Sequence, residues 1–183
     1  VWTYSGVRPL QDTSEGNASA VTRDYSIKVN WENEVPFINI FGGKITTYRK
    51  LSECVLNEVA AFFPKMRGPW TAEAYLPGGD FPVNGVSDLI LDLLRDYPFL
   101  NEKWAARLVK AYGREAFEML GSVRSEDDLG INFGATLTQK EVEWLIGEEF
   151  ATSAEDILWR RSKLGLRMGA LQVKNLQKFI ATQ

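Results

Sequence analysis

A short segment in the first third of the chain constrains the fold most strongly. An apolar run at residues 37–40 predicts a strand, and Gly42 and Gly43 follow almost directly. Lys44 comes next, and apolar side chains then recur at helical spacing over residues 45–63. The segment therefore predicts a strand that ends in a glycine turn and continues into a long amphipathic helix.

This strand–glycine–helix junction is a candidate ligand site. Glycines let a ligand approach the backbone closely, and the start of a helix presents unpaired N–H groups and the positive end of the helix dipole. The junction therefore favours an anionic or electron-rich group, such as a phosphate or the pyrimidine edge of a flavin. A tight turn in which the glycines only relieve crowding is an equally open alternative.

Composition narrows the classes of chemistry. The 183 residues are 45% hydrophobic and include six Trp and ten Phe, which favours a packed core over disorder. The net charge of −3 provides no overall basic field for nucleic acid. With no histidine and a single cysteine, Cys54, the chain disfavours a transition-metal site, a histidine-based triad and an internal disulfide. Acid–base chemistry would fall to carboxyl, lysine or tyrosine groups or to a cofactor.

The N-terminal part predicts a β-hairpin that leads into the glycine turn. Polar and apolar side chains alternate over residues 22–31, residues 32–34 form a turn, and the strand at 37–40 returns. We also expect a short strand at residues 1–5 and a loop at residues 11–20. The first residue is not Met and lies inside an expected strand, so we expect a piece of a longer protein. No run reaches the roughly 18–20 apolar residues that span a bilayer.

Beyond an irregular linker that includes residues 76–79, the pattern is helical and predicts no strand. We expect an α+β chain with two domains, in which residues 1–69 hold the hairpin and the long helix and residues 70–183 are all helical. Thr138 and Glu141 are spaced as a capping box. Helices are expected at about residues 86–96, 101–112, 115–120, 138–150, 153–161 and 170–181.

Three features that could bind nucleotides, nucleic acid or lipid are weak. A P-loop at the glycine turn would need Gly in place of Ile38 and Ser or Thr in place of Ile45, and the dinucleotide fingerprint G-x-G-x-x-G is absent. The basic cluster at residues 159–163 could meet a phosphate-bearing surface, but we favour an inward-packed Trp159 and a solvated helix end. No basic recognition helix is present, so nucleic-acid binding is not expected.

Three cationic side chains are candidates for an anion site. Arg8 precedes a proline, which restricts its backbone to extended forms, and its guanidinium could clamp a phosphate or carboxylate. Lys44 stands at a helix start, where the dipole disfavours a cation, so an anionic ligand is one explanation for it. Arg23 adjoins Asp24, and an ion pair between these neighbours is the simpler interpretation. A surface position is the simpler alternative for Arg8.

Five motifs occur in an order that resembles a known family. They are Trp-Thr-Tyr-Ser-Gly-Val-Arg-Pro-Leu at 2–10, Thr-Arg-Asp-Tyr at 22–25, Phe-Gly-Gly-Lys-Ile-Thr-Thr-Tyr-Arg-Lys-Leu at 41–51, Leu-Pro-Gly-Gly at 76–79 and Leu-Trp-Arg-Arg-Ser-Lys at 158–163. Together they resemble the C-terminal part of FAD-dependent, respiratory glycerol-3-phosphate dehydrogenases. The resemblance covers essentially the whole chain, and the N-terminal dinucleotide-binding region of that family is not part of it.

The resemblance implies a function and a set of site residues. It implies oxidation of sn-glycerol 3-phosphate to dihydroxyacetone phosphate, with electrons passing from reduced FAD to a membrane quinone. Arg8 and Lys44 would line the substrate pocket, with Arg23 as a weaker addition, and the resemblance names no catalytic base. The FAD contacts implied are Gly42, Gly43, Lys44, Ile45 and Thr46.

The resemblance also implies partners and leaves rivals open. Residues from about 70 onward would form a helical cap that packs on the flavin domain, contributes to a homodimer or docks near the membrane. The protein would be cytoplasmic and peripherally associated with the inner face of the cell membrane. The rivals are a glycerol-3-phosphate oxidase that uses oxygen and a non-catalytic helical interaction domain. We expect residues 1–183 alone to be inactive and to retain little FAD.

Overall fold

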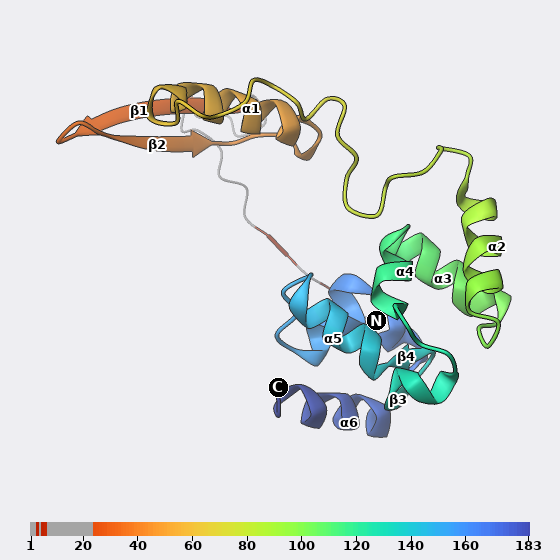
Figure 1. Ribbon diagram of the computed structural model, residues 1–183. Coiled ribbons are helices and arrows are strands. Elements are labelled where there is room, and N and C mark those ends of the chain that lie inside the picture. The colour runs from red at the N-terminus through yellow and green to blue at the C-terminus, as the bar shows by residue number, and fades with distance from the viewer. Residues whose placement is uncertain (1–2, 4, 7–23) are drawn as a thin grey trace. The chain divides into compact units, whose positions relative to one another are not determined.

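The structure is a computed structural model that describes residues 3, 5–6 and 24–183. It divides into two compact units, residues 3–74 and residues 75–183 (Figure 1). Thr3 and Ser5 lie outside any strand, and the rest of the strand expected at residues 1–5 and the loop expected at 11–20 fall outside the described residues. The domain limits of 1–69 and 70–183 stay a prediction.

The first unit is a β-hairpin with a helix beside it (Figure 1). Strands β1 (Ser26–Glu32) and β2 (Val35–Phe41) pair antiparallel, and the turn between them places two non-glycine residues at positive φ, as hairpin turns of two residues require. The expected hairpin is confirmed. The expected single helix is shorter than predicted, because a 3₁₀ turn stands on each side of it. These elements are η1 (Ile45–Thr47), α1 (Tyr48–Glu58) and η2 (Ala60–Phe62).

Two contacts hold the helical segment against the hairpin. The ring of Trp31 on β1 lies 5.7 Å, centroid to centroid, from the ring of Phe62. The hydroxyl of Tyr25, just before β1, lies 3.6 Å from the sulfur of Cys54 on α1. Tyr25 lies at the open end of the hairpin and Trp31 lies near its turn, so the helical segment follows the length of the hairpin. The glycine turn follows β2 at the open end, beside Tyr25.

The second unit is mainly helical and contains the larger core. Leucines that are fully buried come from nearly all of its elements, for example Leu93, Leu108, Leu145 and Leu176. Helices α2, α3 and α4 begin and end as predicted, and the side chain of Asn101 caps α3 by accepting a 3.0 Å bond from the N–H of Trp104. The elements are α2 (Val86–Asp96), α3 (Glu102–Tyr112), α4 (Glu115–Leu120), η3 (Glu126–Leu129), β3 (Asn132–Gly134), β4 (Leu137–Thr138), α5 (Gln139–Gly147), η4 (Asp156–Arg161), η5 (Leu164–Arg167) and α6 (Ala170–Ile180).

The expectation of an all-helical second unit is wrong in one place. Strands β3 and β4 form a short antiparallel hairpin, with Ala135 and Thr136 at positive φ in its turn. The two strands are too short to produce a period-2 pattern, and the turn has none of the Asn-Gly or Asp-Gly signals that mark such turns. The chain as a whole is α+β, as predicted.

The capping box expected at Thr138 and Glu141 is also wrong. The Thr138 side chain caps nothing, and Glu141 is buried with 1% of its surface exposed. A capping box does form at Ser153, whose hydroxyl accepts from the N–H of Asp156 at 3.2 Å while the Asp156 carboxylate accepts from the N–H of Ser153 at 3.0 Å. Both sites have the same residue spacing, and only the partners of the acidic residue distinguish them.

The basic cluster at residues 159–163 belongs to a helix end, as we favoured. Trp159 packs against the core, and Arg160 is ion-paired with Glu155 at 2.8 Å and with Asp156 at 3.1 Å. Arg161 donates two hydrogen bonds to the carbonyl oxygen of Glu149. Arg160 and Arg161 therefore both have partners within the unit.

The segment expected to be a linker is anchored to the second unit at Gly78. The carbonyl oxygen of Gly78 accepts a 2.9 Å bond from the N–H of Arg114, just after α3. Gly78 and Gly113 both have positive φ, and a Cβ on either would overlap backbone atoms at the other's site. Only glycine fits this close approach of two backbones.

Candidate functional site

The candidate site is the turn at residues 42–46, between β2 and α1. Gly42 has φ 71° and Gly43 has φ 110°, a region that other residues rarely adopt. A Cβ built on Gly43 would lie 3.6 Å from Leu51 and 3.8 Å from Tyr25, which are ordinary contacts. At Gly43 the backbone conformation, and not crowding, therefore requires glycine. Relief of crowding is therefore not the reason for glycine at this position, and binding of a ligand at the turn stays a prediction.

The backbone of Lys44 is fixed by the turn that follows it. Lys44 is extended (φ −83°, ψ 144°), and its carbonyl oxygen accepts bonds from both the N–H of Thr47 at 2.9 Å and the Thr47 hydroxyl at 2.8 Å. The Lys44 ammonium lies 2.8 Å from a carboxylate oxygen of Asp24. Asp24 is therefore part of the site, although the sequence analysis paired it with Arg23, which lies outside the described residues.

The start of the helical segment is open to a ligand. Ile45 is 88% exposed and Thr46 is exposed as well. Their N–H groups precede the first helical hydrogen bond, and neither η1 nor α1 has an acidic residue in its first turn. The positive end of the helix dipole at this turn therefore lacks a carboxylate from its own helix.

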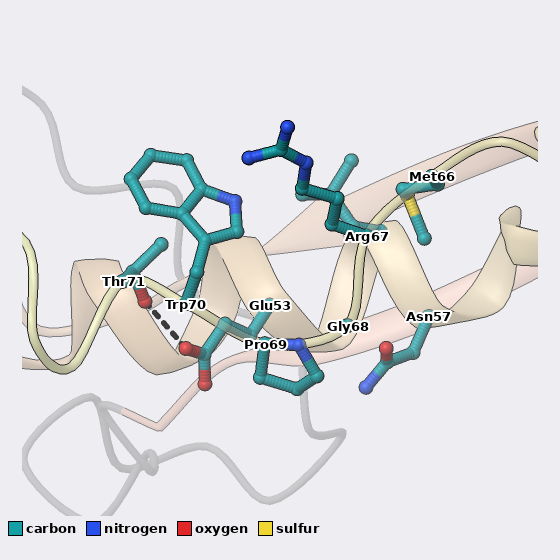
Figure 2. A pocket seen from close by; sticks show the side chains of 9 residues that line it. Glu53, Asn57, Met66, Arg67, Gly68, Pro69, Trp70 and Thr71 are labelled. Carbon is teal, nitrogen blue, oxygen red and sulfur yellow. Dashed lines mark hydrogen bonds between the residues drawn. The ribbon is translucent and has the colours of Figure 1, made fainter.

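Two further cations near the start of α1 are already paired. Arg49 and Lys50 bind opposite oxygens of Glu53 at 3.1 and 3.2 Å. The Thr71 hydroxyl also donates to Glu53, and Figure 2 shows this bond beside the ring of Trp70. These hydrogen bonds, first from Thr71 and then from Lys50, hold the pKa of Glu53 below its usual range. Such a carboxylate is a weak base, and its role here is structural because it joins α1 to Thr71.

Glu53 forms part of the wall of a cavity of about 190 Å³ in the first unit (Figure 2). Its carboxylate is turned towards Thr71, and no other acidic residue lines the cavity among the described residues. We assign no chemistry to this cavity. The lining residues are Glu53, Leu56, Asn57, Met66, Arg67, Gly68, Pro69, Trp70 and Thr71.

The structure brings together only some of the predicted site residues. The five residues predicted to contact FAD lie at one turn, and Lys44 is among them. Arg8 and Arg23 fall outside the described residues, so their place relative to Lys44 stays a prediction. Sequence reasoning missed Asp24 as the partner of Lys44. The signal was the hairpin register, which places the residue two before β1 opposite the glycine turn.

Comparison with known proteins identifies the family. Residues 69–182 match the family model described as the C-terminal domain of alpha-glycerophosphate oxidase. The chain belongs to this family. Over 182 residues it is also 41% identical to a glycerol-3-phosphate dehydrogenase of Pseudomonas aeruginosa, a match that covers 99% of the chain and 35% of that protein. The resemblance found in the sequence is therefore confirmed.

Other relatives carry related names. The aerobic glycerol-3-phosphate dehydrogenase of Escherichia coli is 38% identical over 98% of the chain and 36% of its own length. The D-erythritol 1-phosphate dehydrogenase of Brucella abortus is 40% identical over 88% of the chain and 32% of its own length. The chain thus spans about a third of the length of these relatives. Each of these names describes a dehydrogenase that acts on a phosphorylated polyol.

The described residues contain neither a membrane-spanning helix nor a cluster of metal ligands. No helix among them is both long and apolar enough to cross a bilayer. Within the same residues, no group of three or more His, Cys, Asp and Glu side chains is arranged to hold a metal ion.

Proposed function

We propose that the complete polypeptide is an FAD-dependent dehydrogenase that oxidises sn-glycerol 3-phosphate to dihydroxyacetone phosphate and passes the electrons to a quinone. One observation carries the proposal. The glycine turn at residues 42–46 has the open, positively polarised geometry described above, within a chain that is similar to glycerol-3-phosphate dehydrogenases over nearly its whole length.

The described residues fit one wall of a flavin site. Gly42 and Gly43 have no side chains, so a ligand could approach the backbone there, and the N–H groups of the exposed residues Ile45 and Thr46 could donate to an electron-rich ring edge. FAD, when bound, would supply the hydride acceptor. The role of this chain would be to orient the ring edge and to stabilise negative charge there. Gly42 to Thr46 are the proposed contacts.

Lys44 is the proposed substrate-binding residue within the described part of the chain. Its ammonium, held near the turn, would bind an oxygen of the substrate's phosphate or its hydroxyl. A cation beside the hydroxyl would also favour the alkoxide-like state that precedes hydride loss. Arg8 would clamp the phosphate with two parallel hydrogen bonds, and Arg23 would add a weaker contact.

D-erythritol 1-phosphate is a second candidate substrate. The observation that favours it is the 40% identity to the Brucella abortus enzyme named for that compound. Both candidates are phosphorylated polyols, so the same cationic groups would serve either. Comparing kcat/KM for the two substrates on the full-length protein would decide between them.

The remaining proposals concern acceptor, partners and location. We propose a homodimer on the inner face of the cell membrane, in the cytoplasm, since a quinone acceptor lies in the bilayer. The helical unit would pack on the flavin domain or contribute to the dimer. Sedimentation with lipid vesicles and the mass of the particle in solution test these points separately. Residues 1–183 expressed alone would be inactive and retain little FAD.

The deciding experiment uses the full-length protein. We expect it to purify with yellow, bound flavin whose visible absorbance bleaches when glycerol 3-phosphate is added without oxygen. Turnover with a quinone analogue and little oxygen consumption would support the dehydrogenase, and the reverse would support an oxidase. Protein with no flavin and no response to either polyol phosphate would overturn the proposal in favour of a helical interaction domain.

A further inference from the structure

We propose that Asp24 is a positioning residue that directs the ammonium of Lys44 into the substrate site, an inference that rests on the proposed function. The contact is short, with 2.8 Å between Nζ of Lys44 and Oδ1 of Asp24. Among the ion pairs of residues 24–183, this is the one that involves Lys44. A role for Asp24 follows from how each of the two residues is held.

The backbone of Lys44 is fixed by the turn, whereas its long side chain depends on a separate contact for its direction. Two bonds from Thr47 hold its carbonyl oxygen, and the two glycines before it set the direction of the chain. The four-carbon side chain still has many rotamers, and ordering it costs conformational entropy. A carboxylate within hydrogen-bond distance selects the rotamers that bring the ammonium beside it. Asp24 therefore sets the direction that the backbone leaves undetermined.

The aspartate owes its position to the hairpin. Asp24 stands two residues before β1, whose first residue, Ser26, pairs with Phe41 at the end of β2. Its neighbour Tyr25 contacts Cys54 on α1. The Cβ of Tyr25 would also lie 3.8 Å from a Cβ built on Gly43, so Tyr25 is beside the glycine turn. The register of the strands therefore delivers the carboxylate to the glycine turn.

The pair is suited to orientation more than to stability. The side chains of Lys44 and Asp24 are 51% and 68% exposed, and ion pairs between such exposed groups contribute little to folding. An ammonium has three N–H donors, so Lys44 can keep one bond to Asp24 and give the others to a substrate phosphate or hydroxyl. Arg49 and Lys50 are held by Glu53, whereas Lys44 lies within hydrogen-bond distance of Asp24.

The test is a double-mutant cycle on the full-length enzyme. We expect Asp24→Asn to raise KM for glycerol 3-phosphate by about tenfold, with flavin content and melting temperature unchanged, and Asp24→Glu to restore most of the loss. In a Lys44→Met background, Asp24→Asn should change neither KM nor kcat further. Glu32→Gln, which removes the same charge from the far end of β1, is the matched control and should leave KM unchanged.

The outcomes separate the two proposals. Unchanged KM in Asp24→Asn, or an effect of full size in the Lys44→Met background, would overturn the role of Asp24 while leaving the proposed function intact. A wild-type enzyme whose flavin glycerol 3-phosphate does not reduce would instead remove the proposed function, and with it this inference. A parallel fall in melting temperature and flavin content in Asp24→Asn would assign Asp24 to folding and also overturn the inference.

Discussion

Arg107 and Glu141 form a two-pronged ion pair inside the helical unit, with two guanidinium nitrogens each 2.6 Å from a different carboxylate oxygen. The Tyr112 hydroxyl donates to the same carboxylate at 2.7 Å, and Arg107 also binds Thr136 in the β3–β4 turn. Burial, and then the charge of Glu141, raise the pKa of Tyr112. The network joins α3 to α5 through the carboxylate of Glu141, and it joins α3 to the turn of the short hairpin through Arg107.

Glu141→Gln should destabilise the helical unit strongly. The substitution leaves Arg107, which is half-buried, without its counter-charge. Breaking a buried ion pair costs about 3–5 kcal/mol, and the partial exposure of Arg107 places the expected loss at the lower end of that range. Urea unfolding followed by tryptophan fluorescence measures the change. The matched control is Glu143→Gln, an exposed position on the same helix, which should stay within about 0.5 kcal/mol of wild type. Equal stability of the two variants would contradict a structural role for the network.

Asp156 should make stability depend on pH in the acid range. Hydrogen bonds, first from the Ser153 side chain, lower the pKa of Asp156 to about 2. Because the folded pKa is depressed, the stabilisation is present above the unfolded pKa near 4 and is lost as pH falls towards 2. We expect Asp156→Asn to cost about 1–2 kcal/mol at neutral pH and progressively less below pH ~4. A difference from wild type that stays constant down to pH ~2 would exclude this origin.

Gly113→Ala should destabilise the helical unit through a backbone clash. The new Cβ would overlap the carbonyl of Gly78, and the alanine would have to adopt a positive φ of 56°. A strained position combined with a forced backbone shift costs about 2–4 kcal/mol. Gly147→Ala is the control, since nothing lies within 4 Å of a Cβ there. Thermal unfolding of the two variants side by side gives the answer.

Gly43→Val should remove flavin from the full-length enzyme. The valine must adopt φ near 110°, which costs about 1–3 kcal/mol, and it places a branched side chain where the backbone is proposed to meet the ligand. The ratio of flavin to protein absorbance measures the effect. Gly68→Val, at a position with nothing within 4 Å of a Cβ, should keep normal flavin. Normal flavin content in Gly43→Val would rule out the proposed contact.

Arg8→Ala should lower catalytic efficiency in the full-length enzyme. Loss of the proposed two-pronged contact between Arg8 and the substrate phosphate is expected to cost about 2–4 kcal/mol in kcat/KM. Steady-state kinetics with glycerol 3-phosphate measures the change, with flavin content as the check on folding. Unchanged efficiency would place Arg8 outside the pocket.

Sequence patterns predicted the elements whose signals are local. The limits of α2, α3 and α4 follow from apolar spacing and from caps such as Asn101, and the first hairpin follows from alternation. The partner of Glu141 could not be predicted in this way. Its spacing from Thr138 is that of a capping box, and only an arginine 34 residues away decides its real role. The local sequence pattern therefore predicted the wrong role for Glu141, a helix cap in place of a buried ion pair.

In the candidate site, too, the local feature was predictable from the sequence and the contact between distant residues was not. The glycine turn was predictable, because its conformation is a property of adjacent residues. The contact between Asp24 and Lys44 was not, because it depends on the register of two strands. A one-residue shift in that register would bring a different side chain to the lysine.

The bond between Thr71 and Glu53 has a mechanical consequence for the glycine turn. Glu53 also binds Arg49 and Lys50 in the first turn of α1, so one carboxylate ties the beginning of the helix to the chain that returns alongside it. A shift of α1 along its axis would break the hydrogen bond between Thr71 and Glu53. The glycine turn precedes this helix, so the contact with Thr71 also restrains the element that presents the N–H groups of the turn.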